Sequence, residues 1–380
     1  MKIAAAGFLL FLLCACPVSP PLSSRQRTTD RYFGVISSIV VFDNFSSPRA
    51  VKKWNRAWEE INRLLGYLDS KLSATLPGSD IDRFNALPAG GSISIDRATR
   101  EVLTLARQVF AETEGRFNPG VALLTDLWGF SPRLSRAAGR SLSEPPAAKP
   151  YDRPGGPASA LPEGAYIERF LGLSDFSACI LGEDRRGNPT LTKGAAGREP
   201  EGSPYTLNID LGGIGKGYAA DRCAEILKRF GYTYGLVSIG ASSLFLLERY
   251  SQNQGEEWPV NILSPFDKTT AYRRALGKNE GVSTSGVYDR FYRIGGIPYS
   301  PIIDPRSGRP ASGEILSATV IGGSAAYADG ITTALCVMTP EEARRFIDER
   351  LGGFQVYLIL ADGSLISSGP RALNPPPPPG

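Results

Sequence analysis

Apolar side chains in the N-terminal part of the chain recur at helical spacing. One such stripe, with members three or four positions apart, is formed by Trp54, Trp58, Ile61, Leu65, Leu68 and Leu72. Ser47 and Pro48 stand directly before it, a pair typical of a helix N-cap and first turn. The pattern predicts an amphipathic helix from residue 48 to about residue 71, and a second helix between Asp96 and Gly115.

Further along, short apolar runs alternate with helical periodicity. The runs predict strands at residues 33–42, 205–211, 236–247 (with a bulge at Gly240) and 316–321. Helical spacing predicts helices that end near residue 231 and that cover 324–338 and 341–351, before a hairpin turned at residues 362–363. This order of elements indicates an α+β or α/β protein.

The N-terminus has the pattern of an export signal. Lys2 precedes an apolar run over residues 3–13, which is too short to span a bilayer as a lone helix. The following Leu-Cys-Ala-Cys resembles a bacterial lipobox, with Cys16 as the lipidated first residue of the mature chain. We therefore expect anchoring to the bacterial inner membrane on its periplasmic side; plain secretion with cleavage nearby is the alternative.

Composition shifts along the chain predict its domain plan. Residues 1–15 are expected to be the signal peptide and residues 16–30 a flexible tether. One folded domain is expected over residues 31–367, interrupted at 131–165 by an insertion rich in proline, glycine and alanine. Residues 368–380 form a proline-rich tail that cannot pack as regular structure.

The overall composition excludes several classes of chemistry. The chain has no histidine, which removes Ser-His-Asp and Cys-His nucleophiles and histidine-ligated metals. Its formal net charge is +4, too mild to indicate a nucleic-acid partner. Cys179, Cys223 and Cys336 form no CxxC pair, so buried free thiols are favoured. Carboxylates, hydroxyls, lysine and backbone carbonyls remain for catalysis or metal binding.

The strongest local feature is a glycine-rich turn between a predicted strand and a helix. Its glycines are Gly212, Gly213, Gly215 and Gly217, and Lys216 lies among them. Such a turn lets backbone N–H groups approach a phosphate, and lysine adds a positive charge. The spacing fits neither the Walker loop nor the Rossmann fingerprint, and tight packing explains many such turns equally well.

A second feature combines a carboxylate with a hydroxyl. Asp329 and Thr333 are four residues apart on a predicted helix, so they share one face. With a loop carbonyl they would form an oxygen site suited to Mg²⁺, although a hydrogen bond between the two is the simpler interpretation. Residues 283–286 and 304–308 add hydroxyl-rich and turn segments suited to phosphate contact or to tight turns.

Taken in order, these segments resemble the ApbE family of membrane-anchored FAD:protein FMN transferases. The resemblance covers residues 33–360 in seven blocks, at residues 79–85, 115–119, 127–129, 210–217, 283–286, 303–308 and 328–333. It implies an α+β, two-lobed, T-fold-like architecture with FAD in a central cleft. It also implies Mg²⁺-assisted transfer of FMN from FAD to a threonine of a target protein, with release of AMP.

The resemblance further implies roles for individual residues. Asp329, Thr333 and the backbone carbonyl of Gly213 would hold the metal, and Asp329 and Lys216 would be catalytic. The residues that would contact FAD are Phe33, Thr75, Phe117, Asn118, Pro119, Asp210, Lys216 and Ile302.

The sequence departs from the family pattern at several of these places. Phe33, Thr75 and Asn118 replace the usual methionine, tyrosine and aspartate, and residues 300–301 replace a common histidine.

Three functions stay open at this point. The first is flavinylation of subunits of membrane redox complexes such as Rnf or the sodium-pumping NADH:quinone oxidoreductase. The second is Mg²⁺-dependent FAD pyrophosphatase activity with water as the acceptor. The third is a non-catalytic FAD-binding lipoprotein.

Overall fold

The computed structural model describes residues 22–130, 161–195, 205–248, 257–267, 271–287, 292–294, 297–311 and 313–369. The predicted signal peptide and lipidated Cys16 lie outside these ranges, as do residues 131–160 of the expected insertion and nearly all of the tail. Within the described ranges, no helix is both long enough and apolar enough to cross a membrane.

An eight-stranded sheet forms the centre of the larger part of the molecule, and neighbouring strands run antiparallel throughout. In spatial order its strands are β1 (Ser23–Thr29), β2 (Ser37–Asp43), β6 (Gly235–Ile239), β7 (Ser243–Leu246), β10 (Glu280–Gly286), β15 (Ile315–Ile321), β16 (Gln355–Leu360) and β17 (Leu365–Ser368). An antiparallel sheet with helices packed on one face is an α+β fold, as the resemblance implies.

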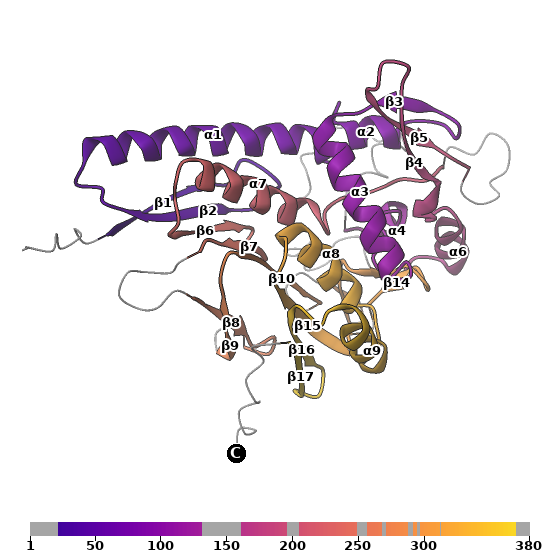
Figure 1. The fold of residues 1–380 in the computed structure, drawn as a ribbon. Helices are drawn as coiled ribbons and strands as arrows, with labels where there is room; N and C mark the ends of the chain where they lie inside the picture. Colours follow the sequence, from indigo (N-terminus) through magenta and orange to yellow (C-terminus); the bar gives the residue numbers. More distant parts are fainter. Residues whose placement is uncertain are drawn as a thin grey trace, which may run out of the picture.

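Three layers result from the alternation of side chains along the strands (Figure 1). Val356 and Leu358 of β16 enter the main core under the helices, while Tyr357 and Ile359 enter a second core on the opposite face. The hairpin β8 (Trp258–Leu263) and β9 (Ala271–Gly277) covers that second core. The central strands are thus buried on both faces.

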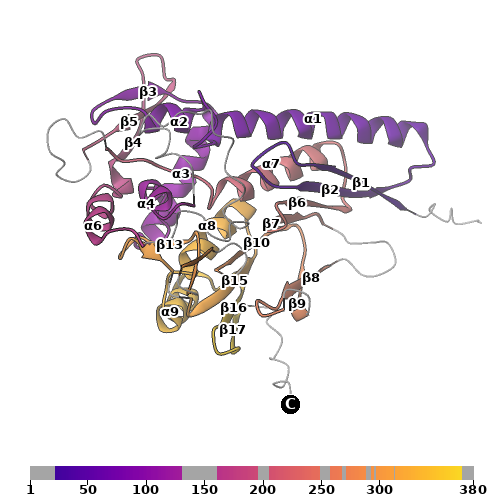
Figure 2. The same cartoon turned by 180° about the vertical axis from the view of Figure 1, so that it is seen from behind.

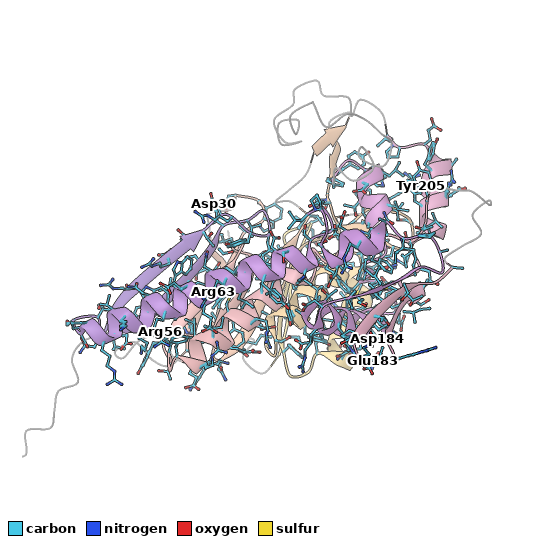
Figure 3. All side chains as sticks on the ribbon, turned by 90° about the horizontal axis from the view of Figure 1, so that it is seen from above. Asp30, Arg56, Arg63, Glu183, Asp184 and Tyr205 are labelled. Atoms are coloured by element: carbon cyan, nitrogen blue, oxygen red, sulfur yellow. The ribbon has the colours of Figure 1, made fainter. Side chains whose placement is uncertain are left out.

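The helical layer is built around α7 (Gly215–Arg229), which contacts α1 (Pro48–Leu72), α8 (Ala325–Leu335) and the sheet. The predicted stripe of α1 is buried except for Trp58, which is only partly buried; Ile61 and Leu65 are fully inaccessible, and the opposite face is polar. Seen from above, α1 lies along the top of the molecule with Arg56 and Arg63 on its outer side (Figure 3).

A smaller part lies at the C-terminal end of α1 (Figure 2). It contains the sheet β3–β5–β4, with β3 (Ser92–Ser94), β5 (Pro189–Lys193) and β4 (Cys179–Glu183), and the short hairpins β11 (Tyr292–Ile294) with β12 (Ile297–Tyr299) and β13 (Ile303–Asp304) with β14 (Arg309–Pro310). Its helical elements are α2 (Asp80–Asn85), α3 (Arg97–Glu112), α4 (Ala122–Leu127), α6 (Gly164–Gly172) and η2 (Phe176–Ala178), while α9 (Pro340–Arg350) follows α8.

Four sequence predictions need correction. Ser23–Thr29 was expected to belong to a flexible tether, but this segment pairs with β2 as an edge strand. It is almost wholly polar and exposed, so it joins the sheet through backbone pairing without any apolar signal. The strand expected at residues 33–42 starts only at Ser37, because Phe33 and Gly34 have φ of 57° and 62° and form a turn.

The other two corrections concern the strands predicted at residues 236–247 and 205–211. Residues 236–247 form a hairpin instead of one bulged strand, since Gly240 and Ala241 adopt φ of 67° and 59°. Residues 205–211 form only an isolated parallel bridge between Asn208 and Val121. Here Asn85 replaces the missing strand partner, because its side-chain amide donates to the carbonyl of Ile209 and accepts from the same residue's N–H.

Candidate active site

The centre of the candidate site is the carboxylate of Asp329 on α8, which is 3% exposed. Its Oδ2 accepts a hydrogen bond of 3.1 Å from the Gly217 N–H at the start of α7. Its Oδ1 accepts one of 3.0 Å from the Ser283 hydroxyl on β10. The Lys216 Nζ lies 3.6 Å from Oδ2. Two elements distant in sequence, α7 and β10, therefore fix this carboxylate, and Lys216 of α7 balances its charge.

The glycine-rich turn is braced on both sides. The Lys216 ammonium donates to the Gly212 carbonyl at 2.7 Å, and the Gly212 N–H donates to Asp210 Oδ1 at 2.8 Å. Asp210 and Lys216 thus hold the turn in place, and the lysine charge sits between a carbonyl and the Asp329 carboxylate.

Two glycines of this segment are packed closely, each against a different neighbour. A Cβ on Gly217 would lie 2.2 Å from the Ala325 carbonyl oxygen, so α7 and α8 cross there without room for a methyl group. A Cβ on Gly213 would lie 3.2 Å from Thr333 Oγ1 and 3.3 Å from the Phe117 ring. Gly213 therefore brings its backbone close to the predicted metal hydroxyl.

Two of the residues predicted to hold Mg²⁺, Asp329 and Thr333, are joined by a hydrogen bond, and the Thr333 hydroxyl lies beside Gly213. The Thr333 hydroxyl donates to the Asp329 backbone carbonyl at 3.1 Å, so the simpler interpretation, a hydrogen bond between these two residues, is confirmed, and the bond goes to the backbone carbonyl of Asp329. No group of three or more His, Cys, Asp or Glu side chains capable of holding a metal occurs among the described residues. One carboxylate, one hydroxyl and one carbonyl fit Mg²⁺, which takes few protein ligands and completes its shell with water and substrate phosphates.

The segment Phe117–Pro119 lies against the glycine turn. The Pro119 carbonyl accepts a hydrogen bond of 2.9 Å from the Asp210 N–H. Asn118 uses both ends of its amide inside the protein, since Nδ2 donates to the Ser174 carbonyl and Oδ1 accepts from the Gly120 N–H. An aspartate could not make the first bond, which gives a structural reason for asparagine here.

The other residues predicted to contact FAD are placed by different interactions. The Phe33 N–H donates to Asp69 of α1, and the Thr75 N–H donates to Ser73 just beyond the end of that helix. The Ile302 N–H donates to the Ser300 hydroxyl at 3.1 Å, so Ser300 shapes its own loop. The flavin contacts of Phe33, Thr75 and Ile302 stay predictions.

Sequence reasoning missed the role of Ser283. It noted the hydroxyls of residues 283–286 without connecting them to Asp329. The available signal was period-two alternation: Ser283 and Ser285 point to the same face of a strand, and that face meets α8. The Ser285 hydroxyl lies 2.9 Å from Thr332 Oγ1 and 3.5 Å from Thr333 Oγ1, completing a hydroxyl layer beside the carboxylate.

A second carboxylate, Asp221, orders the start of α8. Its two oxygens accept the N–H groups of Ala325 and Ala326 at 2.7 and 3.0 Å. Burial raises the pKa of Asp221 to about 6 despite these bonds. A cavity of about 510 Å³ borders Asp221, Tyr218 and Lys228, and Asp329 does not line it. Because Asp329 and Lys216 do not line this cavity, the candidate site rests on the geometry around Asp329.

Comparison with known proteins places the whole folded region in one group. The model of the ApbE family matches residues 33–358. The chain is 30% identical over 296 residues to the FAD:protein FMN transferase of Klebsiella pneumoniae, covering 78% of this chain and 74% of that protein. It is 29% identical over 306 residues to the enzyme of the same name from Escherichia coli K12, covering 80% and 77% of the two chains.

Solved structures agree with the described fold. The apo flavinyl transferase ApbE of Pseudomonas stutzeri superposes with a TM-score of 0.70 at 26% identity, over 92% of this chain and 95% of that one. The ApbE protein of Thermotoga maritima gives a TM-score of 0.71 at 24% identity, over 91% and 97% of the two chains.

Proposed function

Because this chain belongs to the ApbE family, whose curated relatives are transferases, we propose that it moves the FMN moiety of FAD onto a threonine of a target protein. In this reaction the threonine oxygen forms a bond to the phosphorus of FMN. The bond from that phosphorus to the oxygen bridging to AMP breaks, so AMP leaves with the bonding pair. The hydroxyl proton must pass to a base.

The observation that carries the proposal is the fixed Asp329 carboxylate beside Lys216 and the Gly213–Thr333 contact. Asp329, Thr333 and the Gly213 carbonyl would hold Mg²⁺, which when bound would neutralise the diphosphate and polarise it. Lys216, with 22% of its side chain exposed, supplies a further positive charge to the phosphates.

Proton transfer falls to a carboxylate, because the chain has no histidine. Asp329 is the carboxylate already placed among the phosphate-directed groups, and we assign it the role of accepting the hydroxyl proton. Ser283 and Gly217 keep its two oxygens oriented while it does so.

Hydrolysis of FAD is the second candidate, and the residues before Ile302 favour it. Ser300 and Pro301 fill the stretch in which many family members carry a histidine, so this stretch offers no imidazole base to a threonine hydroxyl. Water needs less positioning than a protein hydroxyl, so a site without that base would give FMN and AMP.

One assay separates these functions from a non-catalytic flavin carrier. The protein is incubated with FAD, Mg²⁺ and an acceptor domain from an Rnf-like or sodium-pumping NADH:quinone oxidoreductase-like subunit, and the products are analysed by intact-protein mass and chromatography. Acceptor mass increased by FMN supports transfer, free FMN with AMP supports hydrolysis, and unchanged FAD contradicts both. Asp329→Asn is the control for site-dependent turnover.

We also propose that the protein is lipidated at Cys16 and faces the periplasm from the inner membrane. The strand β1 begins at Ser23, seven positions after Cys16, and seven residues span at most roughly 25 Å. The anchor would therefore hold the sheet edge close to the bilayer. Mass spectrometry of the N-terminal peptide from membranes tests this, and an unmodified Cys16 would refute it.

A further inference from the structure

Two loops that carry predicted flavin contacts are joined by one carboxylate, that of Glu342 on α9. Arg116 Nη2 donates to Glu342 Oε1 at 2.9 Å, and Arg306 Nη1 lies 3.1 Å from each oxygen of the same carboxylate. Arg116 directly precedes Phe117, and Arg306 lies in the turn between β13 and β14. Glu342 therefore connects segments almost two hundred positions apart in sequence.

Glu342 is itself held rigidly, at the third position of α9. Its Oε2 accepts the Thr339 N–H at 3.0 Å, and its own N–H donates to the Thr339 hydroxyl at 3.2 Å, which completes a capping box. Partial burial acts to raise the pKa of Glu342, but the Thr339 N–H and the two guanidiniums outweigh it and lower this pKa below its usual value. The carboxylate is thus charged and fixed.

Both arginines in this network make several contacts within the protein. Arg306 donates through Nε and Nη2 to both oxygens of Asp304, at 3.0 and 3.1 Å, and also to the Val337 carbonyl. Arg116 pairs with Glu114 at 3.0 Å as well as with Glu342. Three carboxylates therefore face two guanidiniums, so these arginines brace the loops instead of offering a free charge to phosphate.

The first of the joined loops reaches the candidate site at its other end, and the second is closed by a bond within its own hairpin. Phe117 lies against Gly213, and Pro119 bonds to Asp210 beside the glycine turn. On the other loop, the Ile302 carbonyl accepts the Ala311 N–H at 2.8 Å, which closes the β13–β14 hairpin that presents Arg306. A change at Glu342 would remove the one carboxylate that both segments share.

We propose that Glu342 is a positioning residue that sets the separation of the Phe117 and Ile302 segments and so preforms the flavin end of the FAD site. The proposal rests on the function proposed above, because it assumes that these segments receive FAD. Glu342 touches no substrate in this role. It acts through Arg116 and Arg306.

Two single variants separate this role from simple helix capping. Glu342→Gln keeps a capping-box side chain but removes the charge that holds both guanidiniums. Thr339→Ala removes the cap hydroxyl and leaves the contacts of Glu342 with Arg116 and Arg306. FAD affinity is measured by flavin fluorescence for both variants, together with Tm and with KM and kcat for the FMN-forming reaction.

We expect Glu342→Gln to weaken FAD binding roughly tenfold, the loss typical of a charge-assisted hydrogen bond, with KM raised and kcat nearly unchanged. Thr339→Ala should lower Tm while FAD affinity stays within about twofold of the wild type. Equal FAD affinity in Glu342→Gln and wild type would overturn the proposal, as would an equal loss in both variants. A wild-type protein that binds FAD without turning it over would refute the proposed function alone, because the affinities still test the role of Glu342.

Discussion

Two lysines show how differently the two parts of this molecule treat the same charge. Lys216, at the candidate site, is partly exposed and has a carboxylate 3.6 Å away. Lys193, on β5 of the smaller part, is fully buried, and its Nζ donates to the Asn85 carbonyl and the Thr206 hydroxyl, both at 3.0 Å. Burial among neutral partners lowers the pKa of Lys193 to about 8. Lys193 thus ties segments of the smaller part together, whereas Lys216 remains available to a ligand.

The largest effect is expected from removing the charge of Asp329, the carboxylate beside Lys216. Asp329→Asn keeps the size of the side chain but loses the charge that would hold Mg²⁺ and accept the proton. We expect FMN release or transfer to fall on the order of a thousandfold, with Tm changed by only a few degrees. Stopped-time assays at saturating FAD measure this; activity within tenfold of wild type would remove Asp329 from the catalytic centre.

The two lysines can then be exchanged for methionine separately. Lys216→Met should lower turnover about a hundredfold and leave the fold intact, because a charge directed at the phosphates is lost. Lys193→Met should leave turnover within a few-fold, since its partners are structural. Turnover and Tm are measured in parallel for both variants. A lower turnover in Lys193→Met than in Lys216→Met would contradict the contrast between the two lysines.

The buried lysine also predicts a pH dependence of stability. In the unfolded chain the pKa of Lys193 returns to about 10.5, above its folded value of about 8, so the unfolded state holds its proton longer as pH rises. The free energy of unfolding should therefore increase between pH 8 and pH 10, by on the order of 2 kcal/mol from this group.

Urea midpoints of wild type and Lys193→Met over this pH range measure the difference between the two proteins. In Lys193→Met, the free energy of unfolding should lack the increase between pH 8 and pH 10 that Lys193 contributes. Parallel pH profiles for the two proteins would show that the buried position does not perturb this amine.

The smallest expected effect concerns the orientation of Asp329. Ser283→Ala removes the hydrogen bond to Oδ1 and should slow turnover about tenfold, the equivalent of about 1.4 kcal/mol. Thr284 on the same strand faces the other way and pairs with Thr319, so Thr284→Val is the matched control. If both variants slow the reaction equally, the loss of turnover comes from a general disturbance of β10 and not from the lost hydrogen bond to Asp329.

Much of the fold could be predicted because its signals are local. The apolar stripe of α1 fixed its length to within a residue, and the four-residue spacing of Asp329 and Thr333 correctly placed both on one helix face. The strand β1 could not be predicted, since its polar residues pair only through the backbone. The turn at Gly240 was hidden because apolar residues continue on both sides of it.

The site was predictable only in part for a similar reason. The glycine turn and the acid–hydroxyl pair are visible in sequence, but nothing local says that Ser283 meets Asp329 across 46 positions. The pairing of Glu342 with Arg116 and Arg306 depends equally on how α9 packs. Contacts of this kind are products of tertiary packing, and a single sequence without comparison carries no direct trace of them.

The crossing of α7 and α8 at Gly217 limits how this protein can be altered. Any larger residue there would push the two helix starts apart and separate the turn that carries Lys216 from the acid on the neighbouring helix. Engineering of metal preference or catalytic rate therefore has to act through the surrounding hydroxyls, where side chains can be exchanged without moving a backbone. The helix crossing is therefore a position that does not tolerate substitution, and the residues that can be exchanged lie around it.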